Sequence, residues 1–145
     1  MGSRGIHHHR EPAVDLSGVN HVRELIVTAN APASTSPVSV ATRGNGLVFV
    51  SGQMPRDPAS GRIVEGGEAQ ARLSMQHCLE ILKAAGSGPS KVMMTWVYVT
   101  DLSIKPGVNT VFRETFGDQP PARNLVEVRD IGEGALVEIS LIALA

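Results

Sequence analysis

Hydrophobic residues recur at helical spacing in two stretches of the chain. The first runs from Gly67 to Ala85 and ends at Gly86, where a left-handed residue would close a helix. Its apolar positions follow a period of about 3.6 residues and are Ala71, Met75, Cys78, Leu79 and Leu82. The second runs from Val108 to Phe116 and is followed by Gly117 and a pair of prolines. Both stretches therefore predict helices with one buried face.

Runs of β-branched and other apolar residues predict the strands. These runs are Glu24–Ala29, Leu47–Val50, Lys91–Asp101, Leu125–Val128 and Leu136–Ala145. Residues 30–39 contain two prolines, three serines and an asparagine, and so predict a loop. Residues 57–61 combine Asp, Pro, Ser and Gly, which is typical of a turn.

The last predicted strand has two different faces. One face carries Val137, Ile139, Leu141 and Ala143, and the other carries Leu136, Glu138, Ser140, Ile142 and Leu144. The predicted strands outnumber the two predicted helices, which indicates an α+β fold with both helices on one face of a mixed sheet. Apolar residues such as Ile142 and Leu144 would then lack a helix to cover them. We therefore expect a homo-oligomer whose subunits pack sheet to sheet.

Composition narrows the class of protein. The chain has 145 residues, of which 42% are hydrophobic and 19% are charged, as expected for a single globular domain. The net charge of -1 favours neither nucleic acid nor a membrane surface as a partner, and no apolar run is long enough for a membrane span. A single cysteine, Cys78, excludes an internal disulfide, so we expect a cytoplasmic protein.

The first 20 residues have no hydrophobic period, and we interpret them as a flexible leader before one domain at 21–145. The leader contains His7, His8 and His9. Neighbouring histidines on a flexible segment lack a fixed geometry for a metal, so we expect no metal site there.

Two polar residues could carry chemistry. Glu138 lies within an apolar strand, where desolvation would raise its pKa toward that of a general base or acid. It could equally lie on a solvated edge or in a structural ion pair. Arg123 could hold a carboxylate through two parallel hydrogen bonds, but taken alone it fits a surface arginine.

Other candidates have ordinary explanations. Asn109 fits a helix-start residue, Ser51 and Gly52 fit a plain strand end, and Cys78 fits a packed core thiol. The common metal, phosphate and nucleophile motifs, such as HExxH, the P-loop and GxSxG, are absent from the sequence.

The motifs taken together resemble one family. They are LVFVSGQMP (47–55), AQARLSMQ (69–76), VYVTDL (97–102), VNTVF (108–112), PPARNLVEV (120–128) and VEISLIAL (137–144). Their order and spacing over about residues 22–145 resemble the Rid family of reactive-intermediate deaminases, also called YjgF-type and formerly termed endoribonucleases. The closing pattern, with Glu138 fifteen residues after Arg123, is the more specific part.

The resemblance implies a chorismate-mutase-like fold, a homotrimer with a barrel-like core, and active sites between subunits. It implies that Arg123 grips the substrate carboxylate and that Glu138 positions and activates a water. Asn109 would be a cleft asparagine, and Ser51 and Gly52 would line the pocket. The implied reaction is hydrolysis of 2-enamine or 2-imine acids of the 2-aminoacrylate type to 2-keto acids and ammonia, without a metal or organic cofactor.

Two positions depart from the pattern of the deaminating members. Val38 replaces a usual tyrosine, and Leu125 replaces a frequent cysteine. Val38 cannot donate the hydrogen bond of a phenol, and Leu125 would make a pocket wall more apolar. These changes imply a pocket that keeps Arg123 to grip the carboxylate and Glu138 to activate water but differs in its walls.

Two other functions remain open. A trimeric binder of 2-keto acids or related small carboxylates would need Arg123 but not Glu138. An endoribonuclease or translation inhibitor is disfavoured, because the chain lacks a basic bias and a paired histidine arrangement. For that function only His21 and His77 are candidates for ordered histidines, and His77 falls within a predicted helix.

Overall fold

The computed structural model describes residues 22–145, which form one mixed sheet and two α-helices. Its elements are β1 (Glu24–Ile26), β2 (Ala41–Gly44), β3 (Leu47–Gln53), α1 (Gly67–Ala84), β4 (Val92–Val99), α2 (Lys105–Phe116), β5 (Ala122–Glu127) and β6 (Val137–Leu144). Short 3-10 turns, η1 (Pro89–Lys91) and η2 (Leu102–Ile104), precede β4 and α2. The predicted leader with its three histidines, and His21, lie outside the described residues.

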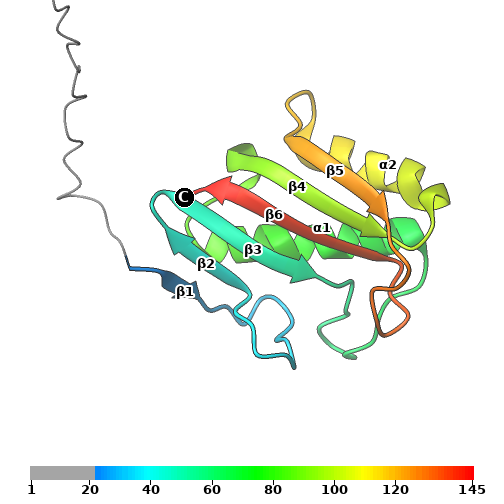
Figure 1. Ribbon diagram of the computed structural model, residues 1–145, viewed down its shortest axis with the longest axis horizontal. Helices are drawn as coiled ribbons and strands as arrows, with labels where there is room; N and C mark the ends of the chain where they lie inside the picture. The colour runs from blue at the N-terminus through cyan, green and yellow to red at the C-terminus, as the bar shows by residue number, and fades with distance from the viewer. Residues whose placement is uncertain (1–21) are drawn as a thin grey trace, which may run out of the picture.

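The sheet has the strand order β1-β2-β3-β6-β4-β5 (Figure 1). Only β4 and β5 are parallel, and the other neighbouring strands are antiparallel. The C-terminal strand β6 therefore lies in the middle of the sheet, paired with β3 and β4. The predicted α+β class with a mixed sheet is confirmed.

Both helices cover the same face of the sheet, as the sequence predicts (Figure 1). The apolar face of α1 is buried against β3 and β6, and Met75, Ile81 and Leu82 are each at most 1% exposed. Cys78 is fully buried, and its thiol donates to the carbonyl of Ile139 at 3.6 Å. Burial raises the pKa of this thiol, so Cys78 is a core residue and not a nucleophile.

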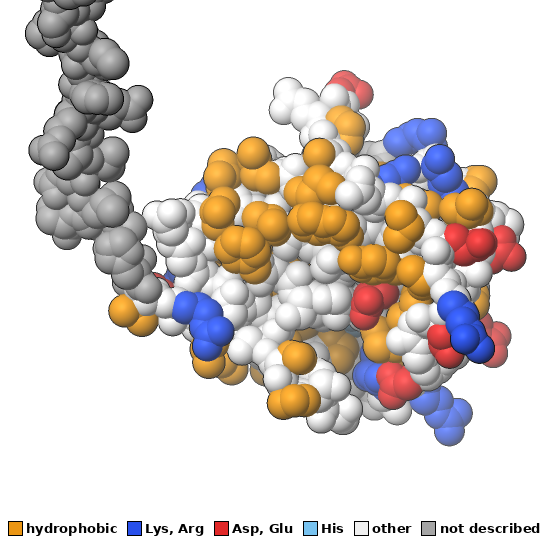
Figure 2. Space-filling model, in the orientation of Figure 1, with side chains coloured by type: hydrophobic (Ala, Val, Ile, Leu, Met, Phe, Trp, Pro, Cys, Tyr) orange, Lys and Arg blue, Asp and Glu red, His pale blue; other side chains and the backbone are white. Residues whose placement is uncertain are grey.

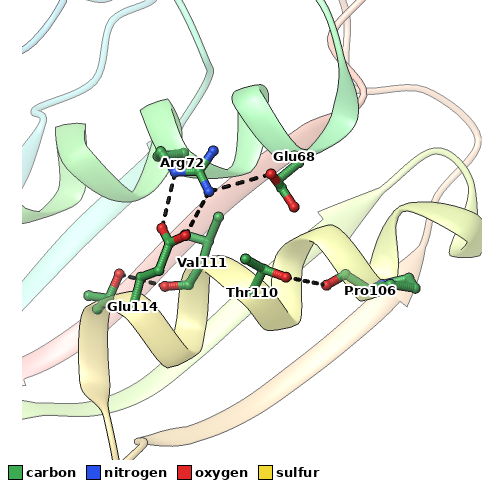
Figure 3. A network of polar contacts seen from close by, with 7 residues as sticks. Glu68, Arg72, Pro106, Thr110, Val111 and Glu114 are labelled. Atoms are coloured by element: carbon green, nitrogen blue, oxygen red, sulfur yellow. Dashed lines mark hydrogen bonds and ion pairs between the residues drawn. The ribbon is translucent and has the colours of Figure 1, made fainter.

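An ion-pair network joins the two helices (Figure 3). Arg72 of α1 donates through Nη2 to Glu114 Oε1 of α2 at 2.9 Å and through Nε to Oε2 at 3.1 Å. It also reaches Glu68, one turn earlier on α1, at 3.5 Å. Gly107 permits the close approach of α2, because a Cβ there would lie 2.9 Å from Glu68 Cβ. These contacts fix the position of α2 relative to the sheet.

The structure differs from the sequence predictions by one additional strand and at several element boundaries. Strand β2 was not predicted, because its four residues include the polar Thr42 and Arg43. It forms through pairing with β3 across a turn at Asn45 and Gly46, whose φ values of 50° and 76° suit a tight hairpin. β1 ends at Ile26 and not at residue 29. Helix α2 begins at Lys105, three residues before the predicted start, with Pro106 in its first turn.

The opposite face of the sheet has no helix. Phe49 and Leu144 are 44% and 45% exposed, and Ile142 lies between Phe49 and Met94 in the register. Figure 2 shows hydrophobic side chains gathered over β4 and β6 on this face. The uncovered apolar face expected from the alternation of β6 is therefore present. None of the helices within residues 22–145 is long and apolar enough to cross a membrane.

The buried helix stripe yields a stability prediction. Leu82→Ala removes a fully buried side chain from α1 and should lower the free energy of unfolding by about 2–5 kcal/mol. Leu102→Ala, at a leucine that is 51% exposed, is the matched control and should cost less than about 1 kcal/mol. Urea unfolding followed by circular dichroism measures both. Equal losses would contradict the assignment of the core.

Candidate active site

A β-bulge interrupts the pairing of β3 with β6. The flanking register pairs are Val50 with Leu141 and Gln53 with Ile139. Strand β3 therefore has Ser51 and Gly52 where β6 has only Ser140. Bulges of this kind re-aim side chains and are frequent beside active sites. The predicted plain strand end at Ser51 and Gly52 is thus wrong, because β3 continues to Gln53 after the bulge.

The loop before β2 is tied to the bulge. The Ser51 hydroxyl donates to the carbonyl of Ser39 at 2.6 Å, and the Ser51 N–H donates to the carbonyl of Val40 at 2.9 Å. The Ser51 proton is therefore committed to the backbone, and its oxygen keeps only acceptor capacity. These bonds hold Val38, which is 57% exposed, near the same end of β3.

The Glu138 carboxyl group lies directly against Gly52. A Cβ added to Gly52 would stand 2.7 Å from Glu138 Cδ and 2.8 Å from Oε1. A side chain at position 52 would force the carboxyl group to shift, so glycine permits the observed position of the carboxylate. In the register Glu138 is opposite Tyr98 of β4.

Glu138 is partly buried and forms no ion pair with a described lysine or arginine. Desolvation raises the pKa of its carboxyl above the ordinary glutamate value. Because β6 is a central strand, Glu138 is not on a sheet edge. Neither ordinary explanation, a solvated edge or a structural ion pair, describes this residue.

A cavity of about 250 Å³ opens beside the bulge. Its lining residues come from three segments and are Pro32–Ser36, Val38, Val40, Ser51–Met54, Arg56 and Ile131–Glu133. Three predicted site residues, Val38, Ser51 and Gly52, thus lie on one cavity, with Glu138 in contact with Gly52.

Arg123 lies on a second cavity, beside the edge strand β5. This cavity measures about 370 Å³ and is lined by Asn109, Phe112, Arg113, Gly117, Pro120, Pro121 and Arg123. The Arg123 guanidinium stands over the Phe112 ring, 4.8 Å from its centroid, which is a cation–π contact. Stacking on the ring leaves the N–H donors in the guanidinium plane directed away from it.

The Arg123 guanidinium forms no ion pair with the carboxylates within residues 22–145. Partial burial lowers its pKa, although a guanidinium stays protonated at physiological pH. A partly buried cation without a carboxylate partner is suited to an anionic ligand, and the planar fork fits a carboxylate.

Arg123 and Glu138 lie on opposite faces of the sheet within one chain. Arg123 is paired with Thr95, which is fully buried on the helix-covered side. Glu138 is paired with Tyr98, which is three residues further along β4 and therefore on the uncovered side. One chain alone holds two separate half-sites.

The remaining predicted residues have mixed outcomes. Asn109 lines the cavity with Arg123, but it lies one turn inside α2 and does not start the helix. Leu125 packs against the core, and neither cavity lining includes it. Phe112 and Arg113 were not among the predicted site residues, although they follow Asn109 at i+3 and i+4. That spacing on a predicted helix could have identified them.

His77 occupies a different environment from the one expected of a helix surface residue. It is 3% exposed, and its Nε2 is 2.8 Å from the carbonyl oxygen of Arg56. An imidazole buried against the backbone is poorly placed for chemistry on RNA. Within residues 22–145, no group of three or more His, Cys, Asp or Glu side chains is placed to hold a metal ion.

Comparisons with known proteins agree on one family. The sequence model described as Endoribonuclease L-PSP matches residues 28–145. A 2-iminobutanoate/2-iminopropanoate deaminase of Bos taurus is 39% identical over 124 residues, covering 85% of this chain and 90% of the relative. A RutC family protein of Sulfurisphaera tokodaii is also 39% identical, over 82% of this chain and 96% of the relative.

Solved structures give the same result. The Rid family protein YyfA of Yersinia pestis superposes with a TM-score of 0.82 at 35% identity, covering 86% of this chain and all of that one (100%). TdcF of E. coli, solved with bound serine, superposes with a TM-score of 0.81 at 30% identity, over 84% of this chain and 98% of that one. The mixed sheet, the two helices and the matched sequence together show that this chain belongs to the Rid family, the family also described as YjgF-type and Endoribonuclease L-PSP.

Proposed function

We propose that this protein hydrolyses 2-imino acids, the tautomers of 2-enamine acids, to 2-keto acids and ammonia. The observation that carries the proposal is a pair of partly buried charged groups without an ion-pair partner among the described residues, the Arg123 guanidinium and the Glu138 carboxylate. The relatives named 2-iminobutanoate/2-iminopropanoate deaminase support this chemistry. The amino acid bound to TdcF supports a ligand that carries a carboxylate.

We propose that the active sites form between subunits of a homotrimer. The uncovered face of the sheet exposes Phe49 and Leu144, and an apolar face of this kind is usually covered in a soluble protein. Packing of chains over this face would bring the Glu138 side of one subunit toward the β5 edge of its neighbour. Each complete site would then contain Arg123 from one chain and Glu138 from another.

Arg123 would bind the substrate carboxylate through two parallel hydrogen bonds. Phe112 holds the guanidinium from one side, and Asn109 adds an amide to the same cavity. A fixed carboxylate orients the adjacent imine carbon, so that a random encounter with water becomes a positioned one.

Glu138 would act as the general base and then as the general acid. Its carboxylate takes a proton from water as the oxygen adds to the imine carbon, and it passes this proton to the imine nitrogen, which gives a tetrahedral carbinolamine. Glu138 then takes the hydroxyl proton and gives it to the amine nitrogen as the C–N bond breaks, so that the 2-keto acid and ammonia leave and the carboxylate is restored. The raised pKa of Glu138 favours this role, because a base is most effective when its pKa approaches the working pH.

Replacement of Glu138 tests the reaction. Glu138→Gln should lower kcat/KM by about 10²–10⁴-fold, because the amide cannot accept the proton. The assay couples the protein to a serine or threonine dehydratase and measures 2-keto acid formation above the buffer rate. A small-molecule binder would keep its affinity for 2-keto acids in Glu138→Gln and show no turnover in the wild type, which would replace this proposal with the binding function.

The pH dependence follows from the raised pKa of Glu138. In the wild type kcat/KM should fall as the pH drops through this raised value, since protonation removes the base.

Folding favours the protonated form of a carboxyl whose folded pKa is raised, so the stability that the Glu138 carboxyl contributes is lost as the pH rises through that pKa. Glu138→Gln should therefore be at least as stable as the wild type at neutral pH, and this advantage should shrink in acid. Thermal melts across pH measure it.

Mixing of two inactive variants tests the shared site. Arg123→Ala and Glu138→Gln should each form inactive trimers. Unfolding and refolding them together at equal amounts should restore about one quarter of the wild-type activity, because each site draws its two residues independently from different chains. Light scattering gives the oligomeric state. A monomer in solution, or a mixture without activity, would contradict the shared site.

The contact between Gly52 and Glu138 gives a sharper test of geometry. Gly52→Ala places a methyl group 2.7 Å from the carboxyl carbon and should displace it, with a loss of about 100-fold in kcat/KM. Gly44→Ala, in β2, is the control because its Cβ would meet nothing within 4 Å. Steady-state kinetics should show near wild-type activity for Gly44→Ala, and equal losses in the two variants would count against the position of Glu138.

A further inference from the structure

The cavity of Arg123 carries a second arginine. Arg113 of α2 lines it together with Arg123, and none of the residues that line it is acidic. Two like charges on one cavity repel each other, and an anionic ligand offsets this repulsion. The cavity beside the bulge differs, because its Arg56 forms an ion pair with Glu133. Of the two cavities, therefore, only that of Arg123 has an excess of positive charge.

The charge of Arg113 is not neutralised by the described part of its own chain. Arg113 is exposed and forms no ion pair with a carboxylate within residues 22–145. The adjacent Glu114 accepts hydrogen bonds from Arg72 of α1 instead, at 2.9 and 3.1 Å (Figure 3). The helix neighbours of Arg113 at three and four positions are all uncharged, and they are Asn109, Thr110, Phe116 and Gly117.

The two arginines of this cavity differ in exposure. The Arg123 guanidinium is partly buried and lies 4.8 Å from the centroid of the Phe112 ring, whereas Arg113, the residue after Phe112, is exposed. A hydrated, exposed cation attracts an anion that is still in solvent. A partly buried one binds it more firmly, because less water competes for the guanidinium. The pair therefore provides an outer and an inner cation for one anionic ligand.

The position of Arg113 in its helix also has an ordinary explanation. Arg113 is in the last turn of α2, where a cation stabilises the end of the helix. Lys83 has the same place in the last turn of α1 and is likewise exposed, but it lines neither cavity. A role at the helix end is common to both residues, and the contribution to a cavity distinguishes Arg113.

We infer that Arg113 is a capture residue, which attracts the carboxylate of the imino acid to the cavity before Arg123 binds it. This inference rests on the proposed deaminase function and concerns how the same site gains its substrate. An imino acid is also hydrolysed by bulk water, so the protein must bind it at low concentration, where the rate is set by kcat/KM. The net charge of -1 gives the chain no overall attraction for anions, and a local excess of positive charge supplies it.

Replacement of Arg113 tests the capture. At an ionic strength of about 10 mM, Arg113→Gln should lower kcat/KM by about three-fold or more through KM, because the outer cation is lost. The kcat should be unchanged, because Arg123 and Glu138 still act on the bound substrate. Arg113→Lys keeps the charge and should stay within about two-fold of the wild type. Steady-state kinetics with the dehydratase-coupled assay measure both parameters, and an equal loss in Arg113→Lys would overturn a role of the charge.

Ionic strength separates capture from a structural role. The difference between the wild type and Arg113→Gln should disappear at about 1 M sodium chloride, where the Debye length is about 3 Å. Lys83→Gln is the matched control, since it removes one positive charge from the same place in a helix outside the cavity lining. Its kcat/KM should equal that of the wild type at every salt concentration.

Two outcomes would contradict the inference in different ways. An active wild type whose kcat/KM matches that of Arg113→Gln at low salt, or an equal loss in Lys83→Gln, would overturn the capture role and leave the deaminase function in place. No acceleration of imine hydrolysis by the wild type would overturn the deaminase function, and the capture role with it.

Discussion

Strand β6 is hydrogen-bonded to β3 on one side and to β4 on the other, and its alternation determines what each face of the sheet can do. Val137, Ile139 and Leu141 are buried under the helices, so the residues between them must face the other way. A slip of one residue would exchange the two faces and bury Glu138 in the core. The burial of one hydrophobic row thus keeps both the carboxylate and the apolar face open to a partner.

The bulge in β3 adds a second constraint to this arrangement. One extra residue at Ser51–Gly52 places a glycine beside the Glu138 carboxyl and ties the preceding loop to the strand through Ser51. The resulting carboxylate is partly buried but not paired. Its raised pKa is therefore a consequence of backbone geometry and desolvation, and no neighbouring charge is needed to explain it.

The second half-site has a different basis. Helix α2 is held on α1 by Arg72 and Glu114 (Figure 3). Phe112 of the same helix lies under the Arg123 guanidinium. The unpaired cation and the unpaired carboxylate are on opposite faces of one sheet. The chain therefore presents two chemically different surfaces on opposite sides of its sheet.

Much of the fold could be predicted from periodicity. The α1 stripe, the strand at β4 and the two-faced β6 are long enough for the hydrophobic pattern to identify them. Strand β2 could not be identified this way, because it is short and polar and exists only through its pairing with β3. The start of α2 was missed because its first turn contains Pro106 and Gly107 and lacks an apolar period.

Local pattern and recognisable motifs were enough to predict the two-faced last strand, the pair of helices on one side, and Arg123 and Glu138 as candidates. Three other relations became visible only in the folded chain: Gly52 makes room for Glu138, Phe112 supports Arg123, and the two charged groups occupy opposite faces. These relations join residues far apart in the chain. They depend on strand register and helix packing, which a pattern of hydrophobic and polar residues does not encode.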